Sequence, residues 1–162
     1  MLTQERAKSL LALEEDGRLR WIDHYQRPDL IGKLAGSRNQ GYWRLAVDGV
    51  QYYACQIVWL IVYGYIPDVT IDHEDQDGYN DRPGNLRLST KGQNAMNSRM
   101  NSRNTSGLKG VSMCSSTGQW RADIRVNGKS KNLGRYNSAQ EAHLAWRSEA
   151  IKAFGEEFVS GA

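Results

Sequence analysis

Side chains that could together hydrolyse a phosphodiester occur in one short stretch of this chain. Asp72 and His73 are adjacent, and Asn94 follows on a predicted helix. A carboxylate and a side-chain amide supply two of the oxygens that a hard divalent cation prefers. An imidazole beside them can accept a proton from water near neutral pH. The residue types and their order therefore predict a metal-assisted hydrolytic site.

Short elements around these residues should position them. The apolar run 69–71 predicts a strand, Asn85-Leu86-Arg87-Leu88 predicts a second strand, and a helix is expected from about residue 89 or 90. A strand, loop, strand and helix in so few residues would bring Asp72, His73 and Asn94 to one end of a hairpin that the helix braces.

The combination of Asp72-His73, Asn85 and Asn94 resembles the HNH (ββα-metal) endonucleases, in the variant whose last motif residue is Asn. The resemblance implies that Asp72 and Asn94 are metal ligands and that His73 is the general base. It also implies that Asn85 holds the loop and orients His73. Segments between residues 10 and 59 look like the upstream part of phage-type members, which usually carry His where this chain has Cys55.

Two other interpretations of the acidic loop from Asp72 to Gly84 compete with the nuclease. A calcium-binding EF-hand loop would start at His73, would place Asn80 at its apolar position and would end on Gly84 instead of Glu, so it fails at three places. A plain surface loop is the other interpretation, since Asp, Asn and Gly form turns in all kinds of protein. The joint spacing of the four motif residues favours the nuclease.

Composition limits the class of protein. The 162 residues with 40% hydrophobic content suit one or two globular domains, and no apolar run approaches the length that spans a membrane. The N-terminus lacks a secretory signal pattern, and the two cysteines, Cys55 and Cys114, are far apart. These features predict a cytoplasmic protein, which for the phage-type resemblance means the host cell.

Charge is divided unevenly along the chain. Residues 1–90 hold 10 Lys/Arg and 13 Asp/Glu, giving −3, whereas residues 91–162 hold 11 and 5, giving +6. A basic half beside an acidic loop suits a polyanionic partner, here double-stranded DNA. Residues 98–107 are polar and predict a basic linker, in which Arg99 and Arg103 either track DNA or belong to a merely soluble tether.

The N-terminal half has recognisable elements. Thr3 should cap a helix that ends near residues 16–17, and residues 18–22 alternate like a strand. Asp48-Gly49 predicts a hairpin between strands at 42–47 and 50–53, followed by a buried helix over 54–63. Three tryptophans are expected in the core of this half: Trp21, Trp43 and Trp59.

The C-terminal half predicts a small sheet covered by a helix. Strands are expected at 110–113, 119–126 and 131–136, with a turn at Asn127-Gly128. Ser138 and Glu141 form a capping box that opens a helix. The apolar stripe of this helix should cover one face of the sheet: Ala142, Ala145, Trp146, Ala150, Ala153 and Phe154. The other face, with Arg121 and Arg125, stays open and could enter a major groove.

This segment is similar to the plant ethylene-response-factor (APETALA-type) DNA-binding domains. The matching residues are Lys109-Gly110-Val111, Gly118 to Arg125, Leu133-Gly134-Arg135-Tyr136 and Ala139-x-Glu141-Ala142. The resemblance implies that Asp123 and Arg125 touch DNA. We expect Lys109, Arg121 and Lys131 to contact DNA as well.

The expected molecule is an α+β protein with an HNH nuclease core in residues 1–97 (motif at 69–97), a linker at 98–107 and an APETALA-type module at 108–162. It would be a site-specific DNA endonuclease of the phage homing or free-standing type. It would require magnesium, or alternatively manganese, and no small-molecule cofactor. It would not bind a membrane. One alternative is a DNA-binding regulator with a degenerate nuclease core. An RNA-binding protein is a weaker alternative, because the open face lacks the aromatic residues on which RNA bases stack.

Overall fold

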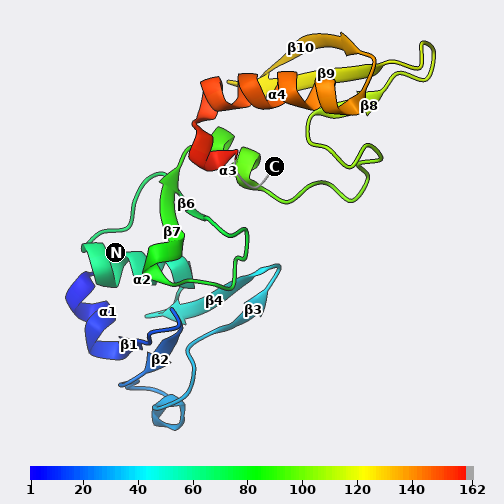
Figure 1. The fold of residues 1–162 in the computed structure, drawn as a ribbon. Helices are drawn as coiled ribbons and strands as arrows, with labels where there is room; N and C mark the ends of the chain where they lie inside the picture. The colour runs from blue at the N-terminus through cyan, green and yellow to red at the C-terminus, as the bar shows by residue number, and fades with distance from the viewer. Residues whose placement is uncertain (160–162) are drawn as a thin grey trace. The chain divides into compact units, whose positions relative to one another are not determined.

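The protein folds as a mixed α+β chain with several small antiparallel sheets, which confirms the predicted fold class. The computed structural model describes residues 1–159. It divides into two compact units, Met1–Ser89 and the chain from Thr90 onward, which Figure 1 colours from blue to green and from green to red. None of the helices among these residues is long and apolar enough to cross a bilayer.

The first unit contains two helices and three small sheets. The elements are α1 (Gln4–Leu10), β1 (Leu11–Leu13), β2 (Leu19–Trp21), β3 (Ser37–Asn39), β4 (Tyr42–Val47), β5 (Val50–Tyr53), α2 (Ala54–Tyr63), β6 (Thr70–His73) and β7 (Leu86–Ser89). β1 pairs with β2, β4 lies between β3 and β5, and β6 pairs with β7. Two 3-10 turns, Pro28–Leu30 and Pro83–Asn85, lie in the connections.

The first helix is shorter than the sequence predicted. Thr3 caps it as expected, because its Oγ1 accepts a hydrogen bond from the Arg6 N–H. The helix ends at Leu10, however, and the next three residues pair with β2, where Leu11 lies opposite Trp21. Both side chains are buried, so the packing of this ladder outweighs the helical spacing of the leucines.

The β4–β5 hairpin and α2 occupy the predicted ranges. Asp48 and Gly49 have φ of +50° and +79°, as a two-residue hairpin turn requires, and Val47 pairs with Val50 across it. α2 begins where Gln56 Oε1 accepts a hydrogen bond from the Tyr53 N–H. Its apolar residues form the centre of the first core, together with the buried Trp21 and Trp59, while Trp43 packs half-buried against it.

The β6–β7 hairpin continues further than expected. The predicted strand ended before the Asp-His pair, but β6 includes both residues, and Asp72 lies opposite Arg87 while His73 lies opposite Leu86. Leu86 is buried in the first core. The motif side chains are therefore anchored on regular strands, and the loop 74–85 joins them.

Gly17 fixes the place of this loop against the turn between β1 and β2. Its φ is +86°, and a Cβ atom there would lie 2.3 Å from the Arg82 backbone N and 2.5 Å from the Asp81 carbonyl carbon. Backbone therefore approaches backbone at a distance that only glycine permits. This close approach fixes the position of the Asp81 backbone.

Substituting Gly17 by Ala should destabilise the fold. A non-glycine residue at positive φ costs about 1–3 kcal/mol, and the overlap with Arg82 adds to that cost. The matched control is Gly49→Ala, since Gly49 also has positive φ (+79°) but meets nothing within 4 Å. Urea denaturation should show a larger loss for Gly17→Ala than for Gly49→Ala; equal losses would mean that the close approach is unimportant.

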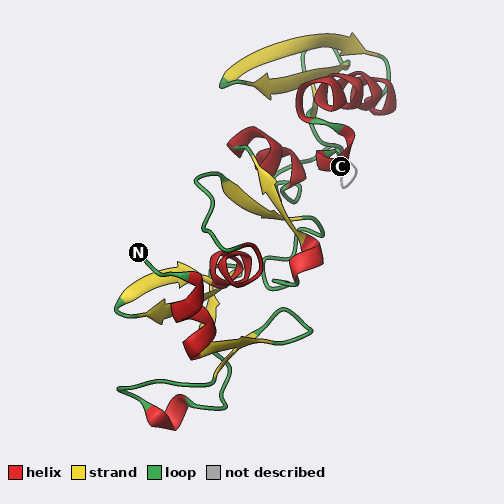
Figure 2. Cartoon of the chain, turned by 90° about the vertical axis from the view of Figure 1, so that its left-hand side faces the viewer, coloured by secondary structure: helices red, strands yellow, loops and turns green. Residues whose placement is uncertain are grey.

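The second unit contains a three-stranded sheet and two α-helices. The elements are α3 (Lys91–Asn97), β8 (Val111–Met113), β9 (Trp120–Val126), β10 (Lys129–Tyr136) and α4 (Ala139–Phe154), with a 3-10 turn at Glu156–Phe158. The strand order is β10-β9-β8, all antiparallel. Figure 2 shows α4 lying along one face of this sheet.

The packing of α4 follows the predicted pattern with one exception. Ser138 Oγ accepts a hydrogen bond from the Glu141 N–H at the start of the helix, and Ala142, Trp146 and Ala150 are buried against the sheet. Ala153, which we placed in the stripe, is exposed, and Ile151 packs against the core instead. Within residues 90–159, the helix that packs along the sheet is α4, and it covers one face.

α3 belongs to the second unit, although we predicted a boundary near residue 97. Thr90 and Gln93 form a reciprocal capping box at its start. Gln93 Nε2 then donates to the Phe154 carbonyl (3.1 Å), and a Cβ at Gly92 would lie 2.8 Å from the Phe154 ring. α3 is therefore packed against the end of α4.

Candidate active site

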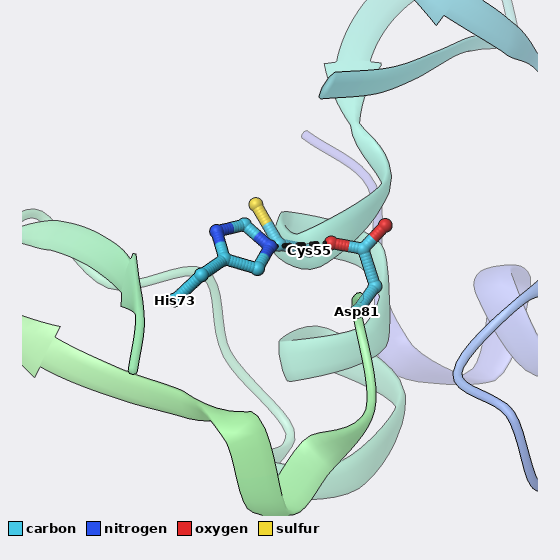
Figure 3. A group of neighbouring side chains, drawn as sticks. All are labelled: Cys55, His73 and Asp81. Carbon is cyan, nitrogen blue, oxygen red and sulfur yellow. Dashed lines mark hydrogen bonds and ion pairs between the residues drawn. The ribbon is translucent and has the colours of Figure 1, made fainter. Parts of the chain in front are cut away.

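His73 is buried at the end of β6 and is held by a carboxylate. Its Nε2 lies 2.8 Å from Asp81 Oδ1, and both side chains are about 95% shielded from solvent. Figure 3 shows the bond between the imidazole and Asp81, with Cys55 beside it. Three elements meet here, because α2 supplies Cys55, β6 supplies His73, and the loop before β7 supplies Asp81.

The electrostatics of this cluster follow from its burial. Burial raises the pKa of Asp81, and the hydrogen bond from His73 opposes that rise. Burial, and then the negative charge of Asp81, raise the pKa of Cys55 to about 12. Cys55 is therefore a neutral thiol at physiological pH, while the His73–Asp81 pair is a hydrogen-bonded acid–base dyad in a low-dielectric environment.

Asp72 meets a different partner from its neighbour. Successive residues of a strand face opposite sides, and the Asp72 carboxylate accepts a hydrogen bond from Arg87 Nε at 3.0 Å. The two residues lie directly opposite each other on β6 and β7. Asp72 is 4% exposed, so this pair places a buried carboxylate on the hairpin.

Asn85 closes the loop between the two strands. Its Oδ1 accepts a hydrogen bond from the Asp75 N–H (3.1 Å), and its Nδ2 donates to Asp75 Oδ1 (2.9 Å) and to the Asn80 carbonyl (2.8 Å). One amide thus ties three groups of the loop. This geometry agrees with a role in holding the loop, while Asp81 provides the hydrogen bond to His73 that orients the ring.

Asp81 is the residue that sequence reasoning missed. It lies in a loop with several other acids, and its spacing from His73 has no local periodicity. Its position depends on the close approach of Gly17, which no short-range pattern indicates. The local signal available was Pro83, which favours extended backbone in the residue before it. That signal does not identify Asp81 as a partner of His73.

Asn94 lies on α3, where its N–H donates to the Thr90 carbonyl at 2.9 Å. α3 is part of the second unit. The place of Asn94 as a metal ligand therefore continues to rest on the motif. As oxygen donors, Asp72 and Asn94 suit magnesium, whereas the cluster of Cys55, His73 and Asp81 offers sulfur, nitrogen and oxygen.

The loop also rests on the β3–β4 turn. A Cβ at Gly78 would lie 2.3 Å from the Gly41 carbonyl and 2.7 Å from the Tyr42 ring. The Tyr42 ring lies 6.0 Å from the His73 ring. The loop 74–85 therefore contacts both the β3–β4 turn and the turn that contains Gly17.

The open face of the second unit's sheet carries cations. Arg121 and Arg125 are exposed there, and Asp123 between them pairs with Arg121 (2.5 Å) and accepts from Asn132 (3.0 Å). Arg135 is the cross-strand partner of Arg121, so it joins the same face although we did not predict it. A β-bulge between Asn132 and Gly134 sets this register.

Two predicted DNA contacts lie elsewhere. Lys131 is the partner of the buried Ile124, on the face that α4 covers, and its Nζ pairs with Glu149 of α4 at 2.5 Å. Lys109 Nζ donates to the Met96 carbonyl (2.8 Å), and burial lowers the pKa of this ammonium. Both cations are used inside the second unit, which argues against the roles predicted for them.

The linker cations are exposed but not helical. Arg99 and Arg103 lie in a segment of bends and turns, where Asn104 Nδ2 donates to the Leu108 carbonyl and Ser106 Oγ to the Val111 carbonyl. Residues 99 and 103 would lie on one face of a helix, but this segment is not helical, so their spacing does not align the two arginines. Their contact with DNA stays a prediction.

Comparison with known proteins finds one family that resembles part of this chain. Residues 52–96 match the family model of an HNH endonuclease, which supports an HNH endonuclease domain at these residues. The match begins on β5 and ends within α3, and it includes Cys55, the Asp72-His73 pair, Asp81, Asn85 and Asn94.

One relative extends this result. The chain is 40% identical over 77 residues to Protein 3.8 of Escherichia phage T7, a stretch that covers 47% of this chain and 64% of that protein. The chain thus spans less than two thirds of the length of this relative. No solved structure matches the chain. The comparisons give no support to the APETALA-type family predicted for residues 108–162.

Proposed function

We propose that this protein is a DNA endonuclease that hydrolyses phosphodiester bonds with a divalent metal ion, and that His73 is its general base. The observation that carries the proposal is the buried His73–Asp81 pair at 2.8 Å inside the HNH endonuclease domain. A phage-type, free-standing or homing, site-specific enzyme is the form that best suits the similarity to a phage protein.

The dyad defines what each of its members does. Asp81 accepts a hydrogen bond from the imidazole and so fixes the ring that takes a proton from water. When that proton arrives, the imidazolium forms next to the Asp81 carboxylate, which stabilises the positive charge. The water gives its proton to His73 and becomes the nucleophile that attacks phosphorus, and the bond from phosphorus to the leaving oxygen breaks.

Asp72 and Asn94 are the residues that would hold the metal, and their oxygens fit magnesium better than a soft metal. A bound divalent ion would polarise the phosphate and stabilise the leaving oxygen. Asp72 would share its carboxylate with Arg87, whose charge keeps the site attractive to phosphate. Asn85 keeps the loop closed so that Asp81 stays beside His73.

A plasmid assay tests the proposal. Supercoiled DNA with magnesium should be nicked or linearised, and a chelator should stop the reaction. DNA binding with no cleavage under any divalent metal would favour the regulator with a degenerate nuclease core.

We also propose that the second unit binds duplex DNA through the open face of its sheet, as an APETALA-type module would. Arg121, Arg125 and Arg135 lie on this face, and a ribbon of two or three strands fits the major groove. Asp123 fixes the Arg121 side chain through their ion pair. Residues 98–107 then act as the connection between the motif and this face.

Replacing Arg121 and Arg125 by Ala should weaken binding without stopping the chemistry. Kd should rise, and the slope of log Kd against log salt should flatten by about one unit for each lost phosphate contact. The control is Lys131→Ala, because Lys131 lies on the covered face. Fluorescence anisotropy over a salt series measures both variants, and an equal change of slope would mean that the open face is not the DNA-binding surface.

A further inference from the structure

Cys55, His73 and Asp81 have the composition of a transition-metal site. Each offers one ligand atom, these atoms all lie within 4.8 Å of one another, and all three side chains are buried. Figure 3 shows the carboxylate directed at the imidazole and the Cys55 sulfur close to the ring. Thiolate, imidazole and carboxylate are the three ligand types that zinc takes in proteins.

We propose that Cys55, His73 and Asp81 bind one zinc ion, at a site separate from the oxygen donors Asp72 and Asn94, and that zinc bound there inhibits the nuclease. The binding half of this proposal stands on the geometry of the cluster alone. The inhibition half rests on the proposed function, because it requires His73 to be the base.

The distances suit such an ion. Zinc bonds of about 2.0–2.3 Å place tetrahedral ligand atoms roughly 3.3–3.7 Å apart. The His73 and Asp81 atoms are 2.8 Å apart as a hydrogen-bonded pair, and every pair in the cluster is within 4.8 Å. Adjustments of about 1 Å, which side-chain rotations can supply, therefore convert the cluster into three corners of a tetrahedron, and water can occupy the fourth.

Charge gives the cluster a reason to take a dication. Without metal, burial and the neighbouring Asp81 keep Cys55 protonated. On binding, the Cys55 thiol proton leaves to solvent, His73 gives a ring-nitrogen lone pair, and Asp81 binds as a carboxylate. The thiolate and the carboxylate then face a double positive charge, and these three charges sum to zero.

Ligand type separates this site from the magnesium site. Thiolate and imidazole favour zinc over magnesium, whereas carboxylate and amide oxygens favour magnesium. Zinc bound to His73 Nε2 would take the place of the hydrogen bond to Asp81, and the ring proton would then lie on the other nitrogen. His73 could then no longer take a proton from water, even with magnesium at Asp72.

Cobalt substitution tests the binding half without any nuclease assay. The metal-free full chain is titrated with Co²⁺, and a thiolate-to-cobalt charge-transfer band in the near ultraviolet should saturate at one equivalent and disappear when Zn²⁺ is added. The band should be lost in Cys55→Ser and kept in Cys114→Ser, which alters the other of the two cysteines. No band in the parent, or a band that survives in Cys55→Ser, overturns the site.

A second ligand variant and a folding measurement serve as controls for the cobalt titration. Asp81→Ala, a second variant of the same cluster, should weaken cobalt binding at least about tenfold, since it removes one of three protein ligands. Circular dichroism with each variant shows whether its fold is intact. If Cys55→Ser does not fold, the parent titration and Asp81→Ala still decide the matter.

Plasmid cleavage tests the inhibition half. With magnesium saturating, zinc at one to two equivalents should slow the parent at least about tenfold, because the contribution of a general base is on the order of 10²–10⁴. Cys55→Ser should lose less than about half of its own zinc-free rate. Cleavage by the parent that zinc does not slow, with the cobalt band present, overturns inhibition but leaves the binding site. A parent that never cuts with magnesium refutes the proposed function while the cobalt result still decides the zinc site.

Discussion

His73→Ala should reduce DNA cleavage by about 10²–10⁴-fold, the usual contribution of a general base, while DNA affinity changes little. The imidazole is buried beside Asp81, and the proposed DNA-contacting arginines lie on another part of the chain. The loss should therefore appear in the single-turnover rate at saturating protein and not in Kd.

The control for this variant is His24→Ala. His24 belongs to the same unit, where its ring packs against Trp21 at 4.6 Å and its Nδ1 accepts a hydrogen bond from the Arg27 N–H. It has no place in the cluster. His24→Ala should cut at nearly the parent rate, and a parent-like rate for His73→Ala would rule out His73 as the base.

Asp81→Asn should lower the cleavage rate by about 10- to 100-fold, a part of what the base itself contributes. An amide of the same shape keeps the packing but removes the negative charge that stabilises the imidazolium. It also allows Asn Nδ2 to donate to His73 and so to select the wrong tautomer. Because Asp81 acts through His73, the rate constant should fall while Kd for DNA stays the same.

The matched control is Asp77→Asn in the same loop, where the Asp77 Oδ1 accepts a hydrogen bond from the Tyr79 N–H and an asparagine oxygen can do the same. A double variant, Asp81→Asn with His73→Ala, sharpens the result. If Asp81 works only through His73, the double variant should cut no more slowly than His73→Ala alone. Additive losses would mean that Asp81 has another role.

Local signals predicted most of the fold. Asp48-Gly49 fixed the β4–β5 hairpin, Ser138 marked the start of α4, and alternation along β9 separated its faces. Each of these signals lies within a few residues of the element that it controls. The end of α1 was wrong because it depends on pairing between Leu11 and Trp21.

The face of β10 shows where sequence reasoning could and could not have gone further. The two-residue turn Asn127-Gly128 places Val126 opposite Lys129, and hence Lys131 opposite Ile124 on the covered face. The position of Lys131 on this face could therefore have been derived from the sequence. The place of Arg135 was not predictable, because the bulge between Asn132 and Gly134 moves it to the open face.

The candidate site was predicted in its motif residues but not in their partners. Asp72, His73 and Asn94 are candidates from their type and order and Asn85 from the family resemblance, and their roles stay predictions, whereas Asp81 lies beside His73 because the loop folds back. The partners depend on contacts between segments far apart in the sequence, such as Gly17 against Asp81 and Arg82. Pattern within a short window carries no information about such contacts.

The packing of α3 against Phe154 limits how the protein can be recombined. The helix that carries Asn94 is completed by residues some sixty positions downstream, since Gln93 bonds the Phe154 carbonyl and Gly92 leaves room for its ring. A chimera that kept residues 1–97 and received a foreign DNA-binding tail would expose this surface of α3. Exchange of the tail should therefore succeed when the new tail brings its own aromatic residue to cover Gly92, whereas a junction before Thr90 would also replace Asn94.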